Sequence, residues 1–582
     1  MKKSHGFPKE LYKIQEKFIK DATNLIEKGQ FGIFSSPTGT GKTISILSTC
    51  ISFMSNSEDD LLDLMNFADK IKIIYCSRTH TQLNQVMNEL NTNIYRYKAT
   101  ILGSRKIYCV NDNVDKTADI EEINKTCHDL IKNDRCGYFL DESKFYQTAN
   151  MNVEESKIKA RENSFCPYYY AKNRASECEI VFLPYNLIFT DEGRKGIDID
   201  LQDKILIVDE AHNIYDTVIN INSAEISLKE IKKISYSKGI FQNLTEIIKR
   251  ILYFFDQFAQ NESKGMKIND FLIKSNLLQF NMLEIDELIK NEKLAQKNEN
   301  LPIFEFSRFL KLLTYSDKNG LIVFDQNFIK FTPLFPDIYF DQIKKCKSVI
   351  FAGGTMEPVD QLKRIFPNIK YFNYQSTNKN VLPLCIGNSI DNRKIILTYE
   401  NRVSLIDSVS KTIVALTYPV KSGGIVIFVP SKAFLDLFKK SPFFNFKRKV
   451  FYEDQNEFTE FIQEPEILVA VMGGKLSEGV NFSDHLCRLL IVVGIPFPLK
   501  TAEYSERVKA DPKYAISTAM QRVNQTIGRS VRHKNDFSGV VLLDYRYNEL
   551  KNYLSPWIIQ QLESCSVCKS IELIQRFLKK NN

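Results

Sequence analysis

The chain has 582 residues, of which 43% are hydrophobic and 25% are charged, and its formal net charge of +8 permits nucleic-acid binding without requiring it. This length is too great for one hydrophobic core and suggests about four domains, with the composition of an ordinary soluble globular protein. The N-terminus MKKSHGFPKE lacks the apolar run of a secretory signal, and runs such as LLIVVGIPF are far shorter than the roughly 20 residues of a membrane span, so we predict a soluble, intracellular protein.

The first chemical motif is FGIFSSPTGTGKTISIL at residues 31–47, which predicts a short apolar strand, a glycine-rich turn and a helix that begins near Lys42. In such a loop, main-chain N–H groups and the helix N-terminus surround phosphate groups. We expect Lys42 to reach the β- and γ-phosphates and Thr43 to place its hydroxyl on Mg²⁺. The alternative, a glycine-rich turn of another α/β protein, is disfavoured by the order of strand, loop and helix. The residues expected to bind the nucleotide are Ser36 (in place of the usual first glycine), Pro37, Thr38, Gly39, Thr40, Gly41, Lys42 and Thr43.

Four cysteines come next, Cys109, Cys127, Cys136 and Cys166, at spacings of 18, 9 and 30 residues. An intracellular chain keeps its thiols reduced, so a disulfide framework is not expected. Structural zinc sites usually contain close CxxC pairs, and this quartet has none. Four unrelated buried thiols are the plain alternative to a metal site.

A second motif, KILIVDEAHNI, follows at residues 204–214. Its continuous apolar run Ile205 to Val208 predicts a strand that is buried on both faces of a parallel sheet. Carboxylates just beyond the C-terminal end of such a strand lie where α/β sheets bind ligands. We therefore expect Asp209 to hold Mg²⁺, and Glu210 to orient or deprotonate the attacking water.

The segment after this motif has a different pattern. Leu244, Ile247, Ile248, Ile251, Leu252 and Phe255 repeat at 3.6-residue spacing and predict an amphipathic helix. FLIKSNLLQFNMLEIDELIKN continues in helical style, and NEKLAQKNEN is typical of a loop. Ordinary helix packing accounts for these apolar stripes.

A third motif, QRVNQTIGRSVRH, lies at residues 521–533. If it is a helix, then Gln525, Gly528, Arg529 and Arg532 share one face. A solvated basic face is the common explanation of such a stripe. However, the phosphate loop has no arginine of its own, and a guanidinium from a second domain would stabilise the γ-phosphate charge, an effect of roughly 10³–10⁵ in rate. We therefore expect hydrolysis to depend on domain closure.

Taken together, these motifs resemble those of superfamily 2 helicases of the XPD-like iron–sulfur branch. The resemblance rests on LYKIQ, SSPTGTGKT, CSRTHTQLNQV, VDEAH, FAGGTMEP, VMGGKLSEGVNFSD and QTIGRSVRH. Further blocks, LGSRKIYCVN, GGTMEPV, VLPLCI and HKNDFSGVVLLDYRY, are most similar to the ChlR/Chl group, the DEAH-box DNA helicases of sister-chromatid cohesion. The similarity extends from Phe7 to about Phe577.

The resemblance implies roles that residue chemistry alone does not assign. Gln15 matches the glutamine that reads the adenine, and Ser77 to His80 match motif Ia on the nucleic-acid side of the first motor domain. Gly354 and Thr355 match motif III, and Ser431 matches motif IV. Motif V is matched by Glu478, Gly479 and Asn481, with Gly479 at the nucleotide; the catalytic set implied is Lys42, Asp209, Glu210, His212, Gln525, Arg529 and Arg532.

The resemblance also implies that Cys109, Cys127, Cys136 and Cys166 hold a [4Fe–4S] cluster, for which four thiolates are suitable ligands. The implied fold is α/β: two RecA-like motor domains, each a parallel sheet flanked by helices, with an inserted iron–sulfur domain and an inserted helical Arch domain. The expected division is 1–104, 171–218 and 331–375 for motor domain 1, 105–170 for the iron–sulfur insertion, 219–330 for the Arch and 376–582 for motor domain 2.

The function that this resemblance implies is an ATP-dependent DNA helicase, a monomeric motor that moves 5′→3′ on single-stranded DNA and unwinds duplex or forked DNA. ATP, Mg²⁺ and the cluster are the implied cofactors, and the nucleus is the implied location, with cohesion or replication-fork proteins as partners. Two alternatives stay open: an RNA helicase, because DEAH boxes are common there, and a nucleotide-gated nucleic-acid-binding scaffold that does not unwind.

Overall fold

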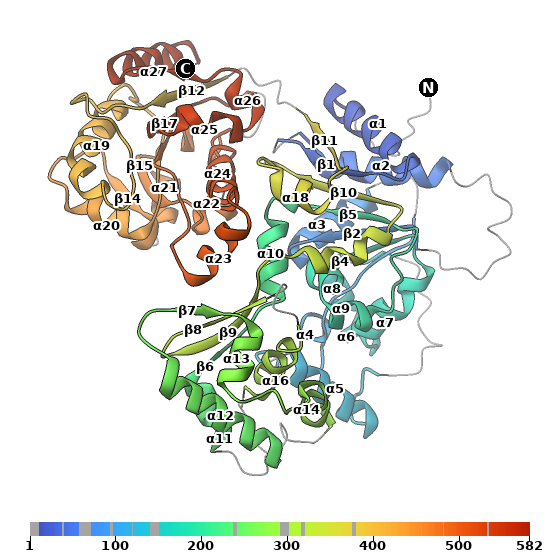
Figure 1. Ribbon diagram of the computed structural model, residues 1–582. Coiled ribbons are helices and arrows are strands. Elements are labelled where there is room, and N and C mark those ends of the chain that lie inside the picture. The colour runs from blue at the N-terminus through green and yellow to red at the C-terminus, as the bar shows by residue number, and fades with distance from the viewer. Residues whose placement is uncertain are drawn as a thin grey trace.

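The computed structural model describes residues 11–37, 40–56, 71–92, 97–118, 120–139, 150–236, 241–291, 302–315, 320–374, 380–455, 457–480, 482–531 and 535–581. These residues form two seven-stranded sheets and one four-stranded sheet. Figure 1 shows the second large sheet and its helices (orange and red) beside the first (blue to teal, and yellow), with the small sheet (green) below them. Within the described ranges, no helix combines the length and the apolar character needed to cross a bilayer.

The first seven-stranded sheet is parallel throughout and has the order β11-β1-β10-β5-β2-β4-β3. The predicted strand is confirmed as β5, with all four residues buried. Strand β10 comes from far along the chain and pairs with β1 on one side and β5 on the other. The strands are β1 (Phe31–Ser35), β2 (Ile73–Ser77), β3 (Ala99–Ile101), β4 (Ile180–Pro184), β5 (Ile205–Val208), β10 (Ser348–Gly353) and β11 (Lys370–Asn373).

Helices pack on this first sheet and share one hydrophobic core with it. Apolar residues such as Phe18 and Leu83 come from helices, whereas Ile33 and Val208 come from strands. This layering is that of a RecA-like motor domain, as predicted. The helices are α1 (Lys13–Glu27), α2 (Lys42–Asn56), α3 (His80–Asn91), α8 (Tyr185–Phe189), α9 (Asp191–Ile197), α10 (Ile214–Ile221), α17 (Asp337–Phe340) and α18 (Asp360–Ile365).

The second seven-stranded sheet is also parallel, in the order β14-β15-β13-β16-β17-β12-β18. Alternate residues of its strands enter two separate cores: Ile427 lies in one, and Val426 and Phe428 lie in the other. Burial on both faces explains the unbroken apolar runs in these strands. The strands are β12 (Val381–Ile386), β13 (Ile425–Val429), β14 (Val450–Tyr452), β15 (Ile467–Val471), β16 (Leu489–Val493), β17 (Ser538–Leu543) and β18 (Glu563–Ser564).

The helices of the second motor domain complete a second RecA-like unit, so both predicted motor domains are confirmed. They are α19 (Arg402–Thr417), α20 (Lys432–Lys440), α21 (Phe458–Gln463), α22 (Lys475–Gly479), α23 (Ala502–Ala510), α24 (Tyr514–Ile527), α25 (Tyr547–Leu550), α26 (Pro556–Ile559) and α27 (Val567–Asn581).

Between β3 and β4 the described residues include four α-helices with very little core of their own. Val110, Ala160 and Phe165 are the buried members of this cluster, and Tyr138 and Tyr170 pack against them half-buried. The predicted boundary at residue 170 falls inside the last of these helices. They are α4 (Arg105–Tyr108), α5 (Ile120–Lys132), α6 (Val153–Asn163) and α7 (Pro167–Arg174).

The second insertion is not purely helical, which corrects the expectation of a helical Arch. It contains an antiparallel sheet in the order β6-β9-β8-β7, with strands β6 (Ala224–Ser227), β7 (Lys264–Met266), β8 (Gly320–Phe324) and β9 (Phe328–Pro333). The runs GLIVF and FIKFTP are rich in β-branched and aromatic residues, which favour strands. The predicted boundary at residue 330 falls inside β9.

Helices cover this small sheet and supply most of its core. The predicted amphipathic helix is confirmed as α12 (Gln242–Phe258), with five of the six residues of its apolar stripe buried and Leu252 half-buried. The second predicted helical stretch is divided into α13 (Ile268–Lys274) and α14 (Met282–Asn291), and α16 (Ile303–Leu312) follows. The predicted loop NEKLAQKNEN lies almost wholly outside the described residues.

Phe254→Ala is expected to destabilise the second insertion by about 3–5 kcal/mol, because it leaves a cavity in a packed aromatic cluster. The Phe254 side chain is fully buried, and its ring centroid lies 4.9 Å from that of Phe271 and 5.0 Å from that of Phe324. Hydrogen exchange across residues 224–333 measures the effect. Tyr253→Ala is the matched control, because this neighbouring side chain is 59% exposed; equal loss of protection in both variants would contradict the prediction.

Candidate nucleotide-binding site

The predicted phosphate loop connects β1 to α2, and its helix begins at Lys42, as expected. Ser36 Oγ lies 2.8 Å from Thr40 Oγ1, and the Thr40 hydroxyl donates a hydrogen bond to the Pro37 carbonyl at 2.7 Å. The Ser36 hydroxyl therefore braces the loop from the position where a glycine was expected. Thr43 is half-buried in the first turn of α2; Thr38 and Gly39 lie outside the described residues.

Gly41 closes the loop in a backbone conformation that suits glycine, with φ of +76°. A Cβ at this position would lie 2.1 Å from Gln15 Nε2. Gln15 itself is buried on α1, accepts a hydrogen bond from the Tyr12 N–H at 2.8 Å and lies 3.5 Å from the Gly41 carbonyl. The structure thus brings Gln15 against the phosphate loop.

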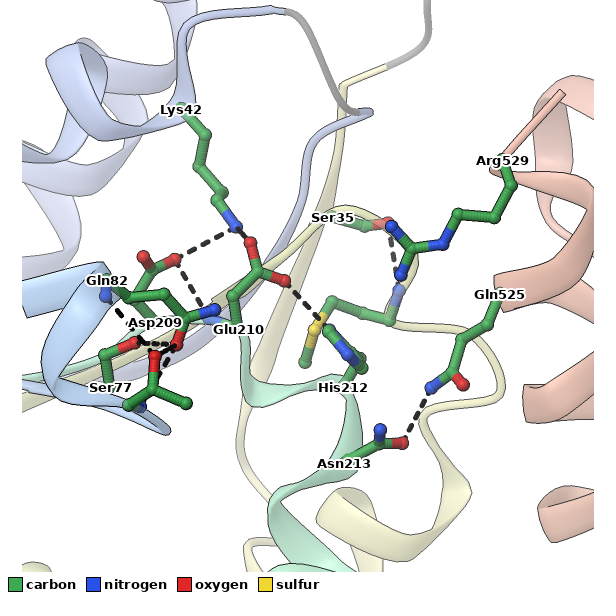
Figure 2. Close-up of polar contacts among 12 residues, drawn as sticks. Ser35, Lys42, Ser77, Gln82, Asp209, Glu210, His212, Asn213, Gln525 and Arg529 are labelled. Carbon is green, nitrogen blue, oxygen red and sulfur yellow. Dashed lines mark hydrogen bonds and ion pairs between the residues drawn. The ribbon is translucent and has the colours of Figure 1, made fainter. Parts of the chain in front are cut away.

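Lys42 reaches the carboxylates at the end of β5. Its Nζ lies 3.0 Å from Asp209 Oδ1 and forms an ion pair with Glu210 (Figure 2). Burial alone would lower the pKa of Lys42, but the two carboxylates hold that pKa above its ordinary value. Lys42 is therefore a fixed cation at the mouth of the loop.

Glu210 lies between Lys42 and His212. His212 Nδ1 lies 3.0 Å from Glu210 Oε2, and Lys42 pairs with the other oxygen. Burial alone would raise the pKa of Glu210, but Lys42 and His212 hold it well below its ordinary range, so the side chain is a carboxylate. Its φ of +53° is unusual for a residue other than glycine, and such strain concentrates at functional positions.

Asp209 is fixed by groups that the sequence did not identify. The Tyr75 hydroxyl donates a hydrogen bond to Asp209 Oδ2 at 2.7 Å, and the Tyr185 hydroxyl donates to the Asp209 carbonyl. The Asp209 N–H donates to the Cys76 carbonyl at 2.8 Å. Burial, and then the nearby Asp209 charge, raise the pKa of Tyr75, so this phenol stays protonated and acts as a donor.

The second motor domain reaches this site through the end of α24. Gln525 Nε2 donates to Asn213 Oδ1 at 2.7 Å, which joins α24 to the segment just after Glu210 and His212 (Figure 2). Asn213 lies 312 residues away from Gln525 in the sequence, and no sequence motif pointed to it as a site residue.

The predicted helix over the third motif ends early, which corrects the expected arginine stripe. Helix α24 stops at Ile527 and Gly528 is its C-cap, so Arg529 lies in the turn beyond it. Arg529 Nε donates to the Ser477 carbonyl at 3.1 Å within the second motor domain, and Figure 2 shows its side chain extending toward the segment that carries Ser35. Arg532 lies outside the described residues.

A buried polar contact joins the two motor domains near motif III. The Glu357 carboxylate accepts hydrogen bonds from Asn373 Nδ2 at 2.8 Å in the first domain and from the Ser555 hydroxyl at 3.1 Å in the second. The Glu357 carbonyl also accepts from Asn524 Nδ2 at 3.0 Å. A Cβ on Gly528, the C-cap of α24, would lie 3.5 Å from Thr355 Cγ2. Thr355 of motif III, which follows Gly354 in the sequence, therefore lies beside the end of α24.

The residues matched to motifs Ia, IV and V have local structural roles. In motif Ia, Ser77 donates to Gln82 Oε1 at 2.8 Å, and Thr79 caps α3, which begins at His80. In motif IV, Ser431 caps α20 by accepting from the Phe434 N–H. In motif V, Glu478 and Gly479 are the last residues of α22, and Asn481 lies outside the described residues.

The four predicted metal-binding cysteines lie around one small cavity. Cys109, Cys127, Cys136 and Cys166 all line one small cavity in the first insertion, together with apolar side chains such as Val110 and Leu130. Burial raises the pKa of Cys109, Cys127 and Cys166. In the part of the chain that the structure describes, no three His, Cys, Asp or Glu side chains are grouped closely enough to hold a single metal ion.

The chain is similar to known helicases along most of its length. A family model named DEAD_2 matches residues 75–231, and one described as a helicase C-terminal domain matches residues 414–561. A protein of Vanderwaltozyma polyspora, "ATP-dependent DNA helicase CHL1", is 30% identical over 606 residues, covering 86% of this chain and 73% of that protein. "ATP-dependent DNA helicase DDX11" of Mus musculus is 26% identical over 675 residues, covering 88% of this chain and 74% of that protein.

Solved structures give the same fold. The structure called "XPD_Helicase" superposes with a TM-score of 0.66 at 19% identity and covers 96% of this chain and 100% of its own. "Structure of S. tokodaii Xpd4" gives 0.58 at 15% identity, covering 95% and 100%. At these identities the superpositions show the fold alone.

Proposed function

The chain belongs to the CHL1 family of ATP-dependent DNA helicases, and from this premise we propose that it hydrolyses ATP to move along single-stranded DNA and to unwind duplex DNA. One observation carries this proposal: Lys42 contacts Asp209 and Glu210 at the carboxyl ends of β1 and β5. Gln525 of the second motor domain lies beside this group and is hydrogen-bonded to Asn213. Ligands of α/β sheets bind at this edge.

We propose the following roles for the residues of this site. Lys42 binds the β- and γ-phosphates, Gln15 reads the adenine, and Glu210 orients the attacking water and accepts its proton. Thr43 and Asp209 would hold Mg²⁺, which neutralises phosphate charge when bound. The main-chain N–H groups of the loop residues Thr38 to Gly41 would donate to phosphate. The Ser36 N–H instead donates to the Gly353 carbonyl at 2.9 Å, and Pro37 has no N–H.

The second motor domain completes the site in this proposal. Gln525, Arg529 and Arg532 meet the γ-phosphate charge, and His212 and Gly479 line the closed cleft. The Gln525–Asn213 hydrogen bond supports this arrangement, because it already holds the end of α24 beside the Glu210 segment. Hydrolysis then depends on domain closure, and this dependence couples ATP turnover to movement.

We further propose that Cys109, Cys127, Cys136 and Cys166 hold a [4Fe–4S] cluster. Their thiols line one cavity, and four thiolates are the usual ligand set of such a cluster. The cluster would stiffen an insertion whose own buried core contains only Val110, Ala160 and Phe165 among the described residues.

By family resemblance, we extend the proposal to the substrate and the cellular role. The substrate is forked DNA, movement is 5′→3′, the location is the nucleus, and the role is in cohesion, replication or repair. The motor acts as a monomer, and its protein partners are cohesion or replication-fork proteins.

Forked DNA with a 5′ single-stranded tail is expected to be unwound, whereas the same duplex with a 3′ tail is not. ATPase stimulation by single-stranded DNA is expected to exceed stimulation by RNA of the same sequence. Unwinding, with and without ATP, and ATPase stimulation are measured on one anaerobically prepared sample. Unwinding of RNA alone would identify an RNA helicase, and DNA-stimulated ATPase without strand separation would identify a nucleotide-gated scaffold.

A further inference from the structure

Tyr75 is a buried tyrosine whose hydroxyl points into the nucleotide-binding site. It lies on β2, next to β5 in the sheet, where Tyr75 pairs with Ile207 and Cys76 pairs with Val208. Its side chain is 0% exposed, and its hydroxyl donates to Asp209 Oδ2 at 2.7 Å. Because Asp209 is only 5% exposed, both partners of this hydrogen bond are buried.

The two oxygens of Asp209 have different surroundings. Oδ1 lies 3.0 Å from Lys42 Nζ and accepts the Glu210 N–H at 2.9 Å, whereas Oδ2 accepts the Tyr75 hydroxyl. The final torsion of an aspartate side chain is broad and roughly two-fold, so packing alone does not fix the plane of its carboxylate. The Tyr75 hydroxyl holds one oxygen while Lys42 and the Glu210 N–H hold the other, and together these contacts fix the plane of the carboxylate.

The main chain of Asp209 is fixed separately, by the Cys76 carbonyl and the Tyr185 hydroxyl. The Tyr75 ring has a packing role of its own, since its centroid lies 5.4 Å from that of Phe182. A phenylalanine would serve this packing role equally. The hydroxyl is therefore the part of Tyr75 that acts on the carboxylate.

We propose that Tyr75 is a positioning residue that orients the Asp209 carboxylate for the Mg²⁺–nucleotide complex. This inference rests on the proposed ATPase function and deepens it. Tyr75 touches neither the nucleotide nor the reacting atoms in this arrangement. It acts through Asp209, as the hydrogen-bonded partners behind metal ligands generally do.

The test uses Tyr75→Phe in the full chain, a change that removes the hydroxyl and keeps the ring. A fluorescent ADP analogue is titrated twice, once with Mg²⁺ and once in EDTA, and the ratio of the two affinities gives the metal-dependent part of binding. The expected result is a fall in this ratio of roughly 10-fold or more, the scale of lost partners behind metal ligands. Binding in EDTA is expected to be unchanged.

In ATPase assays, the Mg²⁺ concentration for half-maximal rate is expected to rise by a similar factor, roughly 10-fold, while kcat at saturating Mg²⁺ falls less. A purely structural role would instead lower the Tm and leave the metal dependence as in the wild type, and this result would overturn the inference. Tyr547→Phe is the matched control: that tyrosine is 0% exposed and donates to the Gly494 carbonyl at 2.7 Å, far from Asp209.

A second comparison uses Asp209→Asn as the background. If Tyr75 acts through the carboxylate, adding Tyr75→Phe to Asp209→Asn produces no further change in the metal-dependent ratio, and a further large fall would overturn the inference. Failure of the proposed function gives a different result. In that case the wild-type protein itself shows no Mg²⁺-dependent binding of the ADP analogue.

Discussion

Lys42→Ala is expected to lower ATP turnover by at least roughly 10²–10³-fold, the cost of removing a single preorganised charge-stabilising group from an active site. Lys42 Nζ is 3.0 Å from Asp209 and also pairs with Glu210, so it is fixed where a nucleotide's terminal phosphates would lie in the proposed site. Turnover is measured as phosphate release at saturating ATP, Mg²⁺ and single-stranded DNA. Unwinding of forked DNA is expected to fall below detection in the same variant.

Stability must be measured alongside turnover, because Lys42 neutralises two carboxylates. Removing one partner of a buried ion pair costs up to about 3–5 kcal/mol, so Lys42→Ala is expected to lower the Tm as well. Lys42→Arg keeps the charge but replaces a compact ammonium with a planar fork, so the Tm should recover while turnover stays low.

Lys439→Ala is the matched control on another lysine ion pair. Lys439 lies 2.8 Å from Asp454 in the second motor domain, away from the nucleotide site, and its loss should leave turnover unchanged. Wild-type turnover in both Lys42 variants would disprove the assignment of the phosphate loop.

Cys127→Ser is expected to abolish iron–sulfur content, from about four irons per chain to near none, because a serine hydroxyl is a poor replacement for a thiolate ligand. Cys127 is 8% exposed and lines the cavity shared with the other three cysteines. Iron, acid-labile sulfide and visible absorption are measured on anaerobically purified protein. Strand separation is expected to be lost, whereas ATP turnover without DNA is expected to persist, since the nucleotide site lies on another part of the chain.

The physical reason for the lost unwinding is the weak core of the first insertion. Metal binding supplies folding free energy where a protein core cannot, so residues 105–170 should become sensitive to protease in Cys127→Ser. Cys385→Ser is the control, because Cys385 is a buried thiol on β12, outside the quartet. Full iron and sulfide content in Cys127→Ser would contradict the cluster assignment, as would a wild-type protein without either.

Features that depend on local sequence were predicted well. The strand at Ile205–Val208 and the start of α2 at Lys42 are both found where apolar runs and the glycine-rich turn indicated them. Two carboxylates after a buried strand must lie at the carboxyl edge of the sheet. The position of Asp209 and Glu210 therefore followed from the sequence.

Features that depend on distant contacts were not predicted. Tyr75 sits in the apolar run IIYCS and resembles any core residue, and only the fold shows that its hydroxyl meets Asp209. Arg529 was placed on a helix because its spacing from Gln525 fits a helical face, yet Gly528 ends that helix first. The antiparallel sheet of the second insertion escaped notice because long helical stretches separate β6 from β7 and β7 from β8, which leaves β8 and β9, of its described strands, as the one hairpin of neighbours.

The position of β10 has a consequence for biosynthesis. This strand lies between β1 and β5 and pairs with both, yet more than 300 residues of chain separate it from β1. At a synthesis rate of about 5–20 residues per second, a ribosome takes roughly 15–60 s to travel that distance. Before residue 348 is made, β1 lacks both of its neighbours, β10 and β11, and β5 lacks β10. Chaperones that shield unpaired strand edges should therefore associate with ribosomes paused before residue 348, and truncation there should yield an insoluble fragment.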